Sequence, residues 1–123
     1  EPLPNLKRLY AESLIGWIPY LIERADDTWR THQWAQGEKR IPKPPSHYYK
    51  KHVYSCFFKD TVGIDLLDRI GEDNVLFETD YPHQDGTFPN TLAIAEELFG
   101  HLEQETIDKI ARNNAIKLFG LTI

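Results

Sequence analysis

Three runs of strand length are each followed by residues at helical spacing, and this alternation constrains the fold more than any other feature of the sequence. The runs occupy 6–11, 53–58 and 75–79. Between the second run and the third there is room for one helix and two short turns, which is the spacing of a β–α–β crossover between neighbouring parallel strands. The alternation therefore predicts an α/β fold built on a parallel sheet.

Turn and capping residues divide the chain into units. Pro19 suits the first turn of a helix expected over 16–29. Asp60 or Thr61 can cap a helix that Gly71 ends in the left-handed conformation. The predicted organisation is a βα unit over 1–29, a Pro/aromatic loop over 30–52, a βα unit over 53–71, and a βα unit over 74–120 with an amphipathic terminal helix at 107–119.

Three parallel strands do not make a closed sheet. They leave two edges of unpaired N–H and C=O groups, which proteins cover or close because open edges promote association. One solution is that these units belong to a larger parallel sheet or barrel. The other is a small free-standing α/β domain in which the segment 30–52 covers one edge. The residues by themselves leave both solutions open.

Charge and cysteine content exclude several classes of partner and compartment. Fourteen Lys and Arg residues against 19 Asp and Glu residues give a net charge of −5. An acidic chain lacks the basic footprint that phosphate backbones require, so we expect no nucleic-acid partner. Cys56 is the only cysteine, which excludes an intrachain disulfide framework and favours a reducing, cytoplasmic compartment.

Two further absences bear on what kind of chain this is. Its longest apolar run is far short of a bilayer crossing, so we expect no membrane association. Methionine is absent, even at position 1. We therefore expect a processed product or a piece of a longer protein.

Three blocks of sequence, in the same order and at matching spacing, carry a resemblance to a known family. They are AESLIGWIPY over 11–20, FETDYPHQDGTFPN over 77–90 and RNNAIKLFG over 112–120. Together they resemble the amidohydrolase-related family of metal-dependent (β/α)8 barrels, similar to aminocarboxymuconate-semialdehyde decarboxylase and the resorcylate-type decarboxylases. The resemblance covers essentially the whole chain. It implies a partial (β/α)8 TIM barrel, comprising strands six to eight and a C-terminal amphipathic helix.

The resemblance also implies catalytic roles for two carboxylates. Asp80 ends the third strand, where barrel enzymes place catalytic groups, and it matches a family Asp that is a metal ligand or a proton-handling group. The simpler interpretation is that Asp80 only bonds the following turn. Glu12 stands where the decarboxylase branch has an acid–base histidine. A glutamate with a raised pKa can also transfer a proton, or it can serve as a structural acceptor for neighbouring backbone.

Arg24 and His83 are the predicted substrate-binding residues. Arg24 matches a family arginine that, in the decarboxylase branch, contacts the substrate carboxylate across a dimer interface, and a guanidinium suits that role. The alternative is an exposed helix arginine. His83 follows Asp80 by three residues and either faces the substrate or caps the turn around Gly86.

The ligand set for a metal is incomplete in this chain. A catalytic zinc site usually has three protein ligands and an open position. The family takes a His-x-His or Glu-x-His motif from strand one and a further His from strand five, and this sequence contains neither motif. With Asp80 as a ligand, the resemblance implies a divalent metal, expected to be zinc. We expect the segment alone to bind metal weakly and to catalyse nothing.

The resemblance implies a parent protein that is a metal-dependent hydrolase acting on a small carboxylated or cyclic substrate. A non-oxidative decarboxylase of the same family is the first alternative, and Glu12 in place of histidine argues against it. The second alternative is a non-catalytic interaction or assembly module held by the exposed sheet edges. The expected partners are the missing N-terminal portion of the barrel, a small-molecule substrate, and further copies of the protein in a homo-oligomer.

Overall fold

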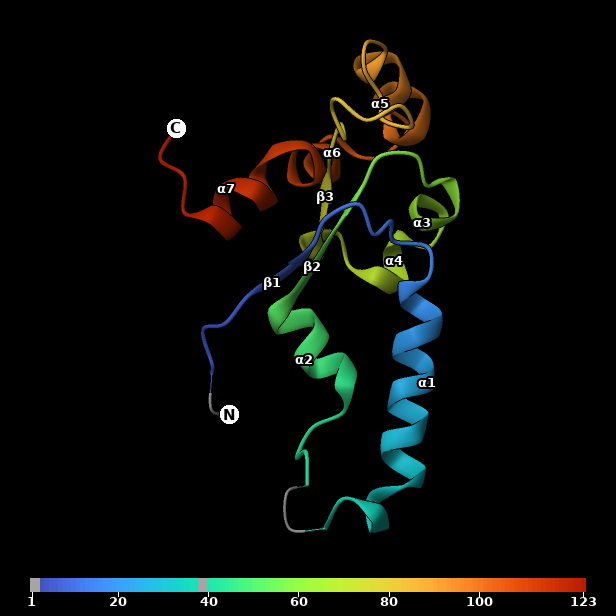
Figure 1. Ribbon diagram of the computed structural model, residues 1–123, viewed down its shortest axis with the longest axis vertical. Coiled ribbons are helices and arrows are strands. Elements are labelled where there is room, and N and C mark those ends of the chain that lie inside the picture. Colours follow the sequence, from blue (N-terminus) through green and yellow to red (C-terminus); the bar gives the residue numbers. More distant parts are fainter. Residues whose placement is uncertain (1–2, 38–39) are drawn as a thin grey trace.

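A computed structural model describes residues 3–37 and 40–123 (Figure 1). Within them, three parallel strands form one sheet in the order β1-β2-β3. The strands are β1 (Arg8–Tyr10), β2 (Val53–Phe57) and β3 (Val75–Phe77). Tyr10 of β1 lies opposite Ser55 of β2, which in turn lies opposite Val75 of β3. The predicted parallel sheet is confirmed, and the strand of the second unit occupies its centre.

Helices connect the strands and extend the molecule beyond the sheet. After β1 comes α1 (Ile18–Thr31), with Pro19 in its first turn, where a missing N–H does no harm. α1 and α2 (Pro45–His52) run side by side below the sheet in Figure 1. The other helices are α3 (Thr61–Asp65), α4 (Leu67–Ile70), α5 (Thr91–Phe99), α6 (Gln104–Asp108) and α7 (Asn114–Phe119), with 3₁₀ turns at Gln33–Ala35 and Glu72–Asn74. Among the described residues, no helix has both the length and the apolar character that a membrane span requires.

The segment 30–52 differs from the loop that we predicted. Its second part is the helix α2, so the prediction is wrong there, whereas residues 38–39 lie outside the described residues. Pro45 starts this helix, and Lys50, Lys51 and His52 occupy its last turn, where cations interact favourably with the helix dipole. Tyr49 anchors it by packing into the core. The prolines thus begin a helix instead of only interrupting one.

Two predicted helices are also less regular than their apolar spacing indicates. The helix expected between Asp60 and Gly71 is broken at Leu66 into α3 and α4. Gly71 has φ 99° and ψ 114°, so its φ is positive as expected but it lies outside the left-handed helical region. The predicted helix at 107–119 contains a π-helical turn at Lys109–Asn113 between α6 and α7. Gly120 does end α7 in the left-handed conformation.

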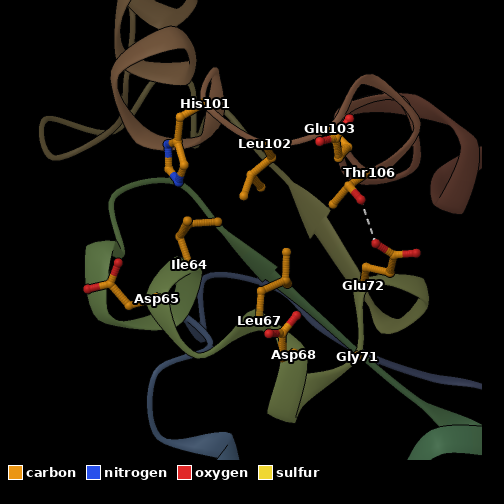
Figure 2. A pocket seen from close by; sticks show the side chains of 10 residues that line it. All are labelled: Ile64, Asp65, Leu67, Asp68, Gly71, Glu72, His101, Leu102, Glu103 and Thr106. Carbon is orange, nitrogen blue, oxygen red and sulfur yellow. Dashed lines mark hydrogen bonds between the residues drawn. The ribbon is translucent and has the colours of Figure 1, made fainter.

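A cavity of about 580 Å³ lies between α3 and α4 on one side and the segment 101–106 on the other (Figure 2). Glu72 contributes to its wall and is held there by Thr106 and Lys109, which both donate hydrogen bonds to its carboxylate. These bonds, with Lys109 contributing most, lower the pKa of Glu72. The cavity lies among the helices that cover the sheet.

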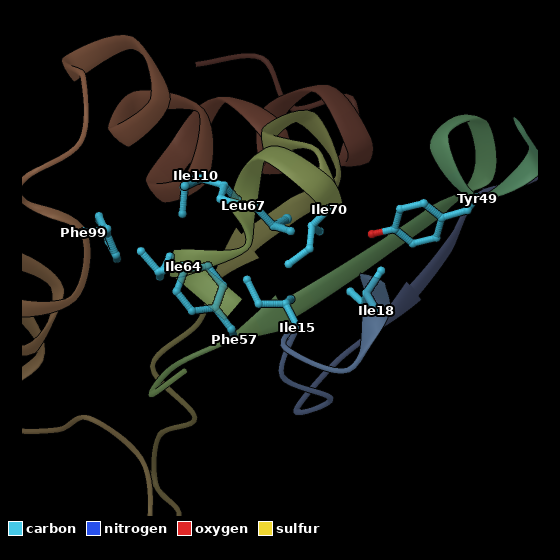
Figure 3. Close-up of a cluster of buried hydrophobic side chains, with 10 residues drawn as sticks. Ile15, Ile18, Tyr49, Phe57, Ile64, Leu67, Ile70, Phe99 and Ile110 are labelled. Carbon is cyan, nitrogen blue, oxygen red and sulfur yellow. The ribbon is translucent and has the colours of Figure 1, made fainter. Parts of the chain in front are cut away.

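The main core lies on the face of the sheet that α3 and α4 cover (Figure 3). Phe57 at the end of β2 is fully buried, and its ring contacts those of Phe77 and Phe99 at centroid distances of 5.8 and 6.0 Å. Figure 3 places Ile64, Leu67 and Ile70 of α3 and α4 against this face, together with Ile15 and Ile18. A smaller cluster comprises Tyr54, Cys56 and Leu76, with Leu9, Ala115 and Leu118 beside it. Both faces of β2 are therefore buried, as a central parallel strand requires.

The two outer strands each pair on one side only among the described residues. Glu78 donates its backbone N–H to the Phe57 carbonyl (2.9 Å). The residues of β3 that alternate with it, Val75 and Phe77, therefore direct their backbone N–H and C=O groups away from β2. Asn114 caps one of those groups, because its buried amide donates to the carbonyls of Val75 (2.8 Å) and Glu72 (2.7 Å). This contact explains a polar side chain in the apolar stripe of the last helix.

Candidate functional site

Glu12, Asp80 and His83 meet where β1 and β3 end. One ligand atom from each of them lies within 4.8 Å of the other two. The imidazole Nδ1 of His83 is 2.8 Å from Oδ1 of Asp80. The Asp80 side chain is only 7% exposed, whereas Glu12 and His83 are exposed. Parallel strands bring their carboxyl ends to one edge of a sheet, so residues 68 positions apart along the chain come together.

The loop after β1 presents Glu12 in an unusual backbone conformation. Glu12 and Leu14 have φ of 53° and 55°, which is uncommon for residues other than glycine and is maintained only where the surroundings fix it. The Glu78 carboxylate provides one such contact, because its Oε1 accepts the Glu12 backbone N–H at 2.7 Å. Asp80, two residues after Glu78, also has a left-handed φ of 53°.

Asp60 holds the next part of the same loop. Its Oδ2 accepts the backbone N–H groups of Ile15 (2.6 Å) and Gly16 (2.7 Å), while its Oδ1 accepts that of Gly63 (2.8 Å) in the first turn of α3. A Cβ at Gly63 would lie 2.8 Å from the Asp60 carboxyl carbon, so only glycine allows this close approach. The predicted cap at Asp60 is confirmed, and the same carboxylate also ties the loop after β1 to the start of α3.

The loop after β3 is held by the strand that it leaves and by Lys59. Thr87 donates from its backbone N–H and its hydroxyl to the Thr79 carbonyl, at 2.9 and 3.2 Å. Lys59, which follows β2, donates from Nζ to the carbonyls of Asp85 (2.8 Å) and Gly86 (2.9 Å). Peptide bonds 81–82 and 88–89 of this loop, each preceding a proline, are cis. The hydrogen bonds from Thr87 and from Lys59 therefore hold the backbone of this loop on two sides.

Charge and burial shift the pKa values of groups around the cluster. Burial raises the pKa of Glu78, and the nearby charges of Asp80 and Glu12 raise it further, while hydrogen bonds from the Glu12 backbone and Cys56 oppose the shift. Burial, reinforced by the Glu78 charge, raises the pKa of the Cys56 thiol to about 12. Cys56 is thus a protonated, buried side chain at neutral pH, which does not favour nucleophilic attack.

His83 is expected to titrate above its ordinary pKa of 6.5. The hydrogen bond to Asp80 is the largest cause of its raised pKa, followed by the charges of Asp80 and Glu12. Since the folded-state pKa is the higher one, this contact stabilises the fold below about pH 6.5 and the contribution fades as pH rises through the raised pKa. An NMR titration of the imidazole should show Asp80→Asn lowering the pKa, with a smaller decrease in Asp85→Asn. An unchanged titration in Asp80→Asn would contradict the assigned contact.

Arg24 does not join this cluster. It lies on α1, where its guanidinium pairs with Asp27 at 3.0 Å and the side chain is 58% exposed. Together with Arg30, it lowers the pKa of Asp27, and Arg30 has the larger effect. Its predicted contact with substrate across a dimer interface stays a prediction.

Sequence reasoning missed the residues that hold the cluster in place. Glu78 and Lys59 were not singled out, and Asp60 was predicted only as a helix cap. The position of Glu78 two residues before Asp80 is a signal that could have found it, since extended residues i and i+2 share a face. No comparable local pattern marks Lys59, whose acceptors lie 26 and 27 positions along the chain.

The cluster lines neither the cavity of Figure 2 nor a second, wider groove. The cavity of Figure 2 is lined by Asp65, Asp68, Glu72 and Glu103 together with neutral residues and His101. A wider apolar groove of about 1080 Å³ runs along β1, α1 and α2. Within the cluster, Glu12 and His83 are exposed at the edge where the strands end, whereas the Asp80 side chain is nearly buried.

A parallel sheet with carboxylate and imidazole side chains in the loops that follow its strands, and with helices packed against it, is the arrangement of one sector of a (β/α)8 barrel. The comparisons with known proteins agree with this class. The amidohydrolase family model matches residues 2–121. The chain therefore belongs to the amidohydrolase family, and its fold matches part of an amidohydrolase TIM barrel.

Solved structures of larger proteins resemble the chain over nearly its whole length. The 5-carboxyvanillate decarboxylase LigW from Sphingomonas paucimobilis has a TM-score of 0.79 at 17% identity, over 98% of this chain and 36% of that one. Amidohydrolase map2389c from Mycobacterium avium subsp. paratuberculosis K-10 has a TM-score of 0.74 at 28% identity, over 95% and 29%. Dihydroxybenzoic acid decarboxylase from Polaromonas sp. JS666, with bound manganese and the inhibitor 2-nitroresorcinol, has a TM-score of 0.64 at 25% identity, over 96% and 35%. The chain spans about a third of the length of these proteins.

Proposed function

We propose that this chain supplies strands six to eight of a (β/α)8 barrel enzyme that uses a divalent metal to act on a small carboxylated, cyclic or aromatic substrate. The observation that carries the proposal is the meeting of Glu12, Asp80 and His83 at the carboxyl ends of β1 and β3. Barrel enzymes of this architecture place their catalytic groups at that end of the strands. Membership of the amidohydrolase family supports the same position for the site.

The donor set of this cluster suits a divalent cation. Two carboxylates and one imidazole are ligands that both Zn²⁺ and Mn²⁺ accept. Sequence reasoning favoured zinc, whereas the Polaromonas decarboxylase carries manganese, so we propose Mn²⁺ as the first ion to test. When bound, such a metal would polarise a substrate oxygen or lower the pKa of a water ligand. The remaining ligands would come from the part of the barrel that precedes this chain.

The proposed roles of Asp80, His83 and Glu12 follow from how exposed each side chain is. Asp80, with its carboxylate almost buried, holds the imidazole of His83 by a hydrogen bond at Nδ1, which leaves Nε2 for a metal or a substrate. Glu12 is exposed on the facing loop, where its carboxylate can take up or release a proton at the substrate. We also propose that Arg24 of a second subunit contacts the carboxylate of the substrate.

Hydrolysis and decarboxylation remain the two candidate reactions. Sequence reasoning favoured hydrolysis because Glu12 replaces the acid–base histidine of the decarboxylase branch. The likeness to the Polaromonas decarboxylase at 25% identity supports decarboxylation instead. Incubating the Mn²⁺-loaded full-length protein with a dihydroxybenzoate tests the decarboxylation directly, because this compound has no hydrolysable bond and can only lose its carboxylate as carbon dioxide while the ring carbon gains a proton. Release of carbon dioxide would support decarboxylation, and its absence would count against it.

We expect the 123-residue chain alone to bind Mn²⁺ and Zn²⁺ weakly. Two of its three candidate ligands are exposed on loops, and Oδ1 of Asp80 is already engaged in the hydrogen bond to His83. Calorimetric titration of the chain with each ion measures this, with Asp80→Ala as the variant and Asp85→Ala as the matched control. Tight one-to-one binding that Asp80→Ala abolishes would contradict our expectation that further ligands come from elsewhere.

A further inference from the structure

The carboxylate of Glu12 depends on a backbone turn that its own sequence does not favour. Neither Glu12 nor Leu14 is glycine, yet both have a left-handed φ. Among the described residues, the hydroxyl of Ser13 bonds to local carbonyls, those of Tyr10 at the end of β1 and of Leu14. Contacts from outside the loop must therefore maintain the turn, since such conformations persist where the surroundings determine them.

Glu78 provides that contact at Glu12 itself. Its Oε1 accepts the Glu12 N–H at 2.7 Å, although the two residues are 66 positions apart. A carboxylate that accepts from a backbone N–H makes a strong, short hydrogen bond. Glu78 also belongs to the segment that carries Asp80. The segment after β3 thus supplies Asp80 and also fixes the backbone of Glu12, whose carboxylate lies near Asp80.

We propose that Glu78 is a positioning residue that holds the Glu12 carboxylate against Asp80 and His83. This inference rests on the metal site proposed above. Glu78 is not among the three residues whose ligand atoms cluster, and its carboxylate already bonds the turn. It therefore acts through Glu12, by fixing the backbone, without touching the metal or the substrate.

Two variants separate positioning from a direct role of the charge. Glu78→Gln keeps an acceptor oxygen for the Glu12 N–H, whereas Glu78→Ala removes it. A matched control is Glu72→Ala, which removes another half-buried, hydrogen-bonded glutamate on the far side of β3. If Glu78→Ala fails to fold, the comparison of Glu78→Gln with wild type still distinguishes an acceptor from a required charge.

The first measurement is hydrogen–deuterium exchange of the peptide spanning residues 11–17 in the full-length protein. The second is the Mn²⁺ dissociation constant, from electron paramagnetic resonance. We expect Glu78→Ala to speed exchange about tenfold and to weaken Mn²⁺ binding about tenfold, as losses of supporting hydrogen bonds around metal ligands do. Glu78→Gln and Glu72→Ala should stay within about twofold of wild type.

Each contrary outcome has a distinct meaning. Equal losses of Mn²⁺ affinity in Glu78→Gln and Glu78→Ala would overturn positioning, because the charge itself would then be needed. Unchanged exchange in Glu78→Ala would overturn it as well. Asp80→Ala tests the underlying site separately. If that variant binds Mn²⁺ like wild type, the proposed function fails, and exchange alone decides whether Glu78 holds the turn.

Discussion

Replacing Asp80 with asparagine is expected to lower the turnover number of the Mn²⁺-loaded full-length protein by about a thousandfold, which is the scale of a lost acid–base or metal-binding group. Asparagine has nearly the same shape and can still accept a hydrogen bond from His83. It cannot carry a negative charge, and it cannot share a proton with the imidazole of His83. The variant therefore tests chemistry at a site whose geometry is preserved.

The measurement is steady-state turnover of a dihydroxybenzoate at saturating Mn²⁺. Asp85→Asn is the matched control, because Asp85 is an exposed carboxylate in the same loop and lies outside the cluster. It should remain within about threefold of wild type. Equal turnover in Asp80→Asn and wild type would mean that Asp80 only terminates the strand.

Asp60→Ala is expected to lower the free energy of unfolding by about 3 kcal/mol, since it leaves three backbone N–H groups without their charged acceptor. Those groups belong to Ile15, Gly16 and Gly63. Asp60→Asn should lose less than Asp60→Ala, because its single amide oxygen can replace only part of the acceptor set. The effect is large because one carboxylate links the loop after β1 to the helix after β2.

Urea unfolding followed by tryptophan fluorescence measures this loss, and Asp68→Ala serves as the control. Asp68 is an exposed acidic residue on the neighbouring helix α4, so its removal should change the free energy of unfolding by less than about 0.5 kcal/mol. If Asp60→Ala and Asp68→Ala are equally stable, water replaces the Asp60 carboxylate without loss, and the link between the two units is unimportant.

The parallel sheet and the residues that meet at its edge could be predicted because both follow from short-range patterns. The alternation of strand and helix fixes strand direction, and parallel strands bring Glu12 and Asp80 to the same end. The grouping of Glu12 with Asp80 and His83 depends on how the loop after β1 turns. That turn is set by a carboxylate 66 residues away, so it leaves no periodic signal.

The same limit explains the errors in the helices. Pro44 and Pro45 predict a loop locally, yet burial of Tyr49 in the core stabilises a helix that begins at Pro45. Spacing of apolar residues over 107–119 predicts a regular helix, but it cannot reveal a π-helical turn. Asn114 falls in the apolar stripe because its amide caps the carbonyl of Val75, a strand residue 39 positions earlier. Contacts with residues distant in the sequence therefore determine where these helices begin and how regular they are.

Three side chains tie the loops after the strands to one another across unit boundaries. Asp60 and Glu78 bond the loop after β1, and Lys59 bonds the loop after β3. A chimera that takes one of these loops from a homologue would inherit only half of each contact. A graft intended to change substrate preference therefore has to transfer the partner side chains along with the loop. In a library that varies a single loop, most variants would lose these contacts and be destabilised.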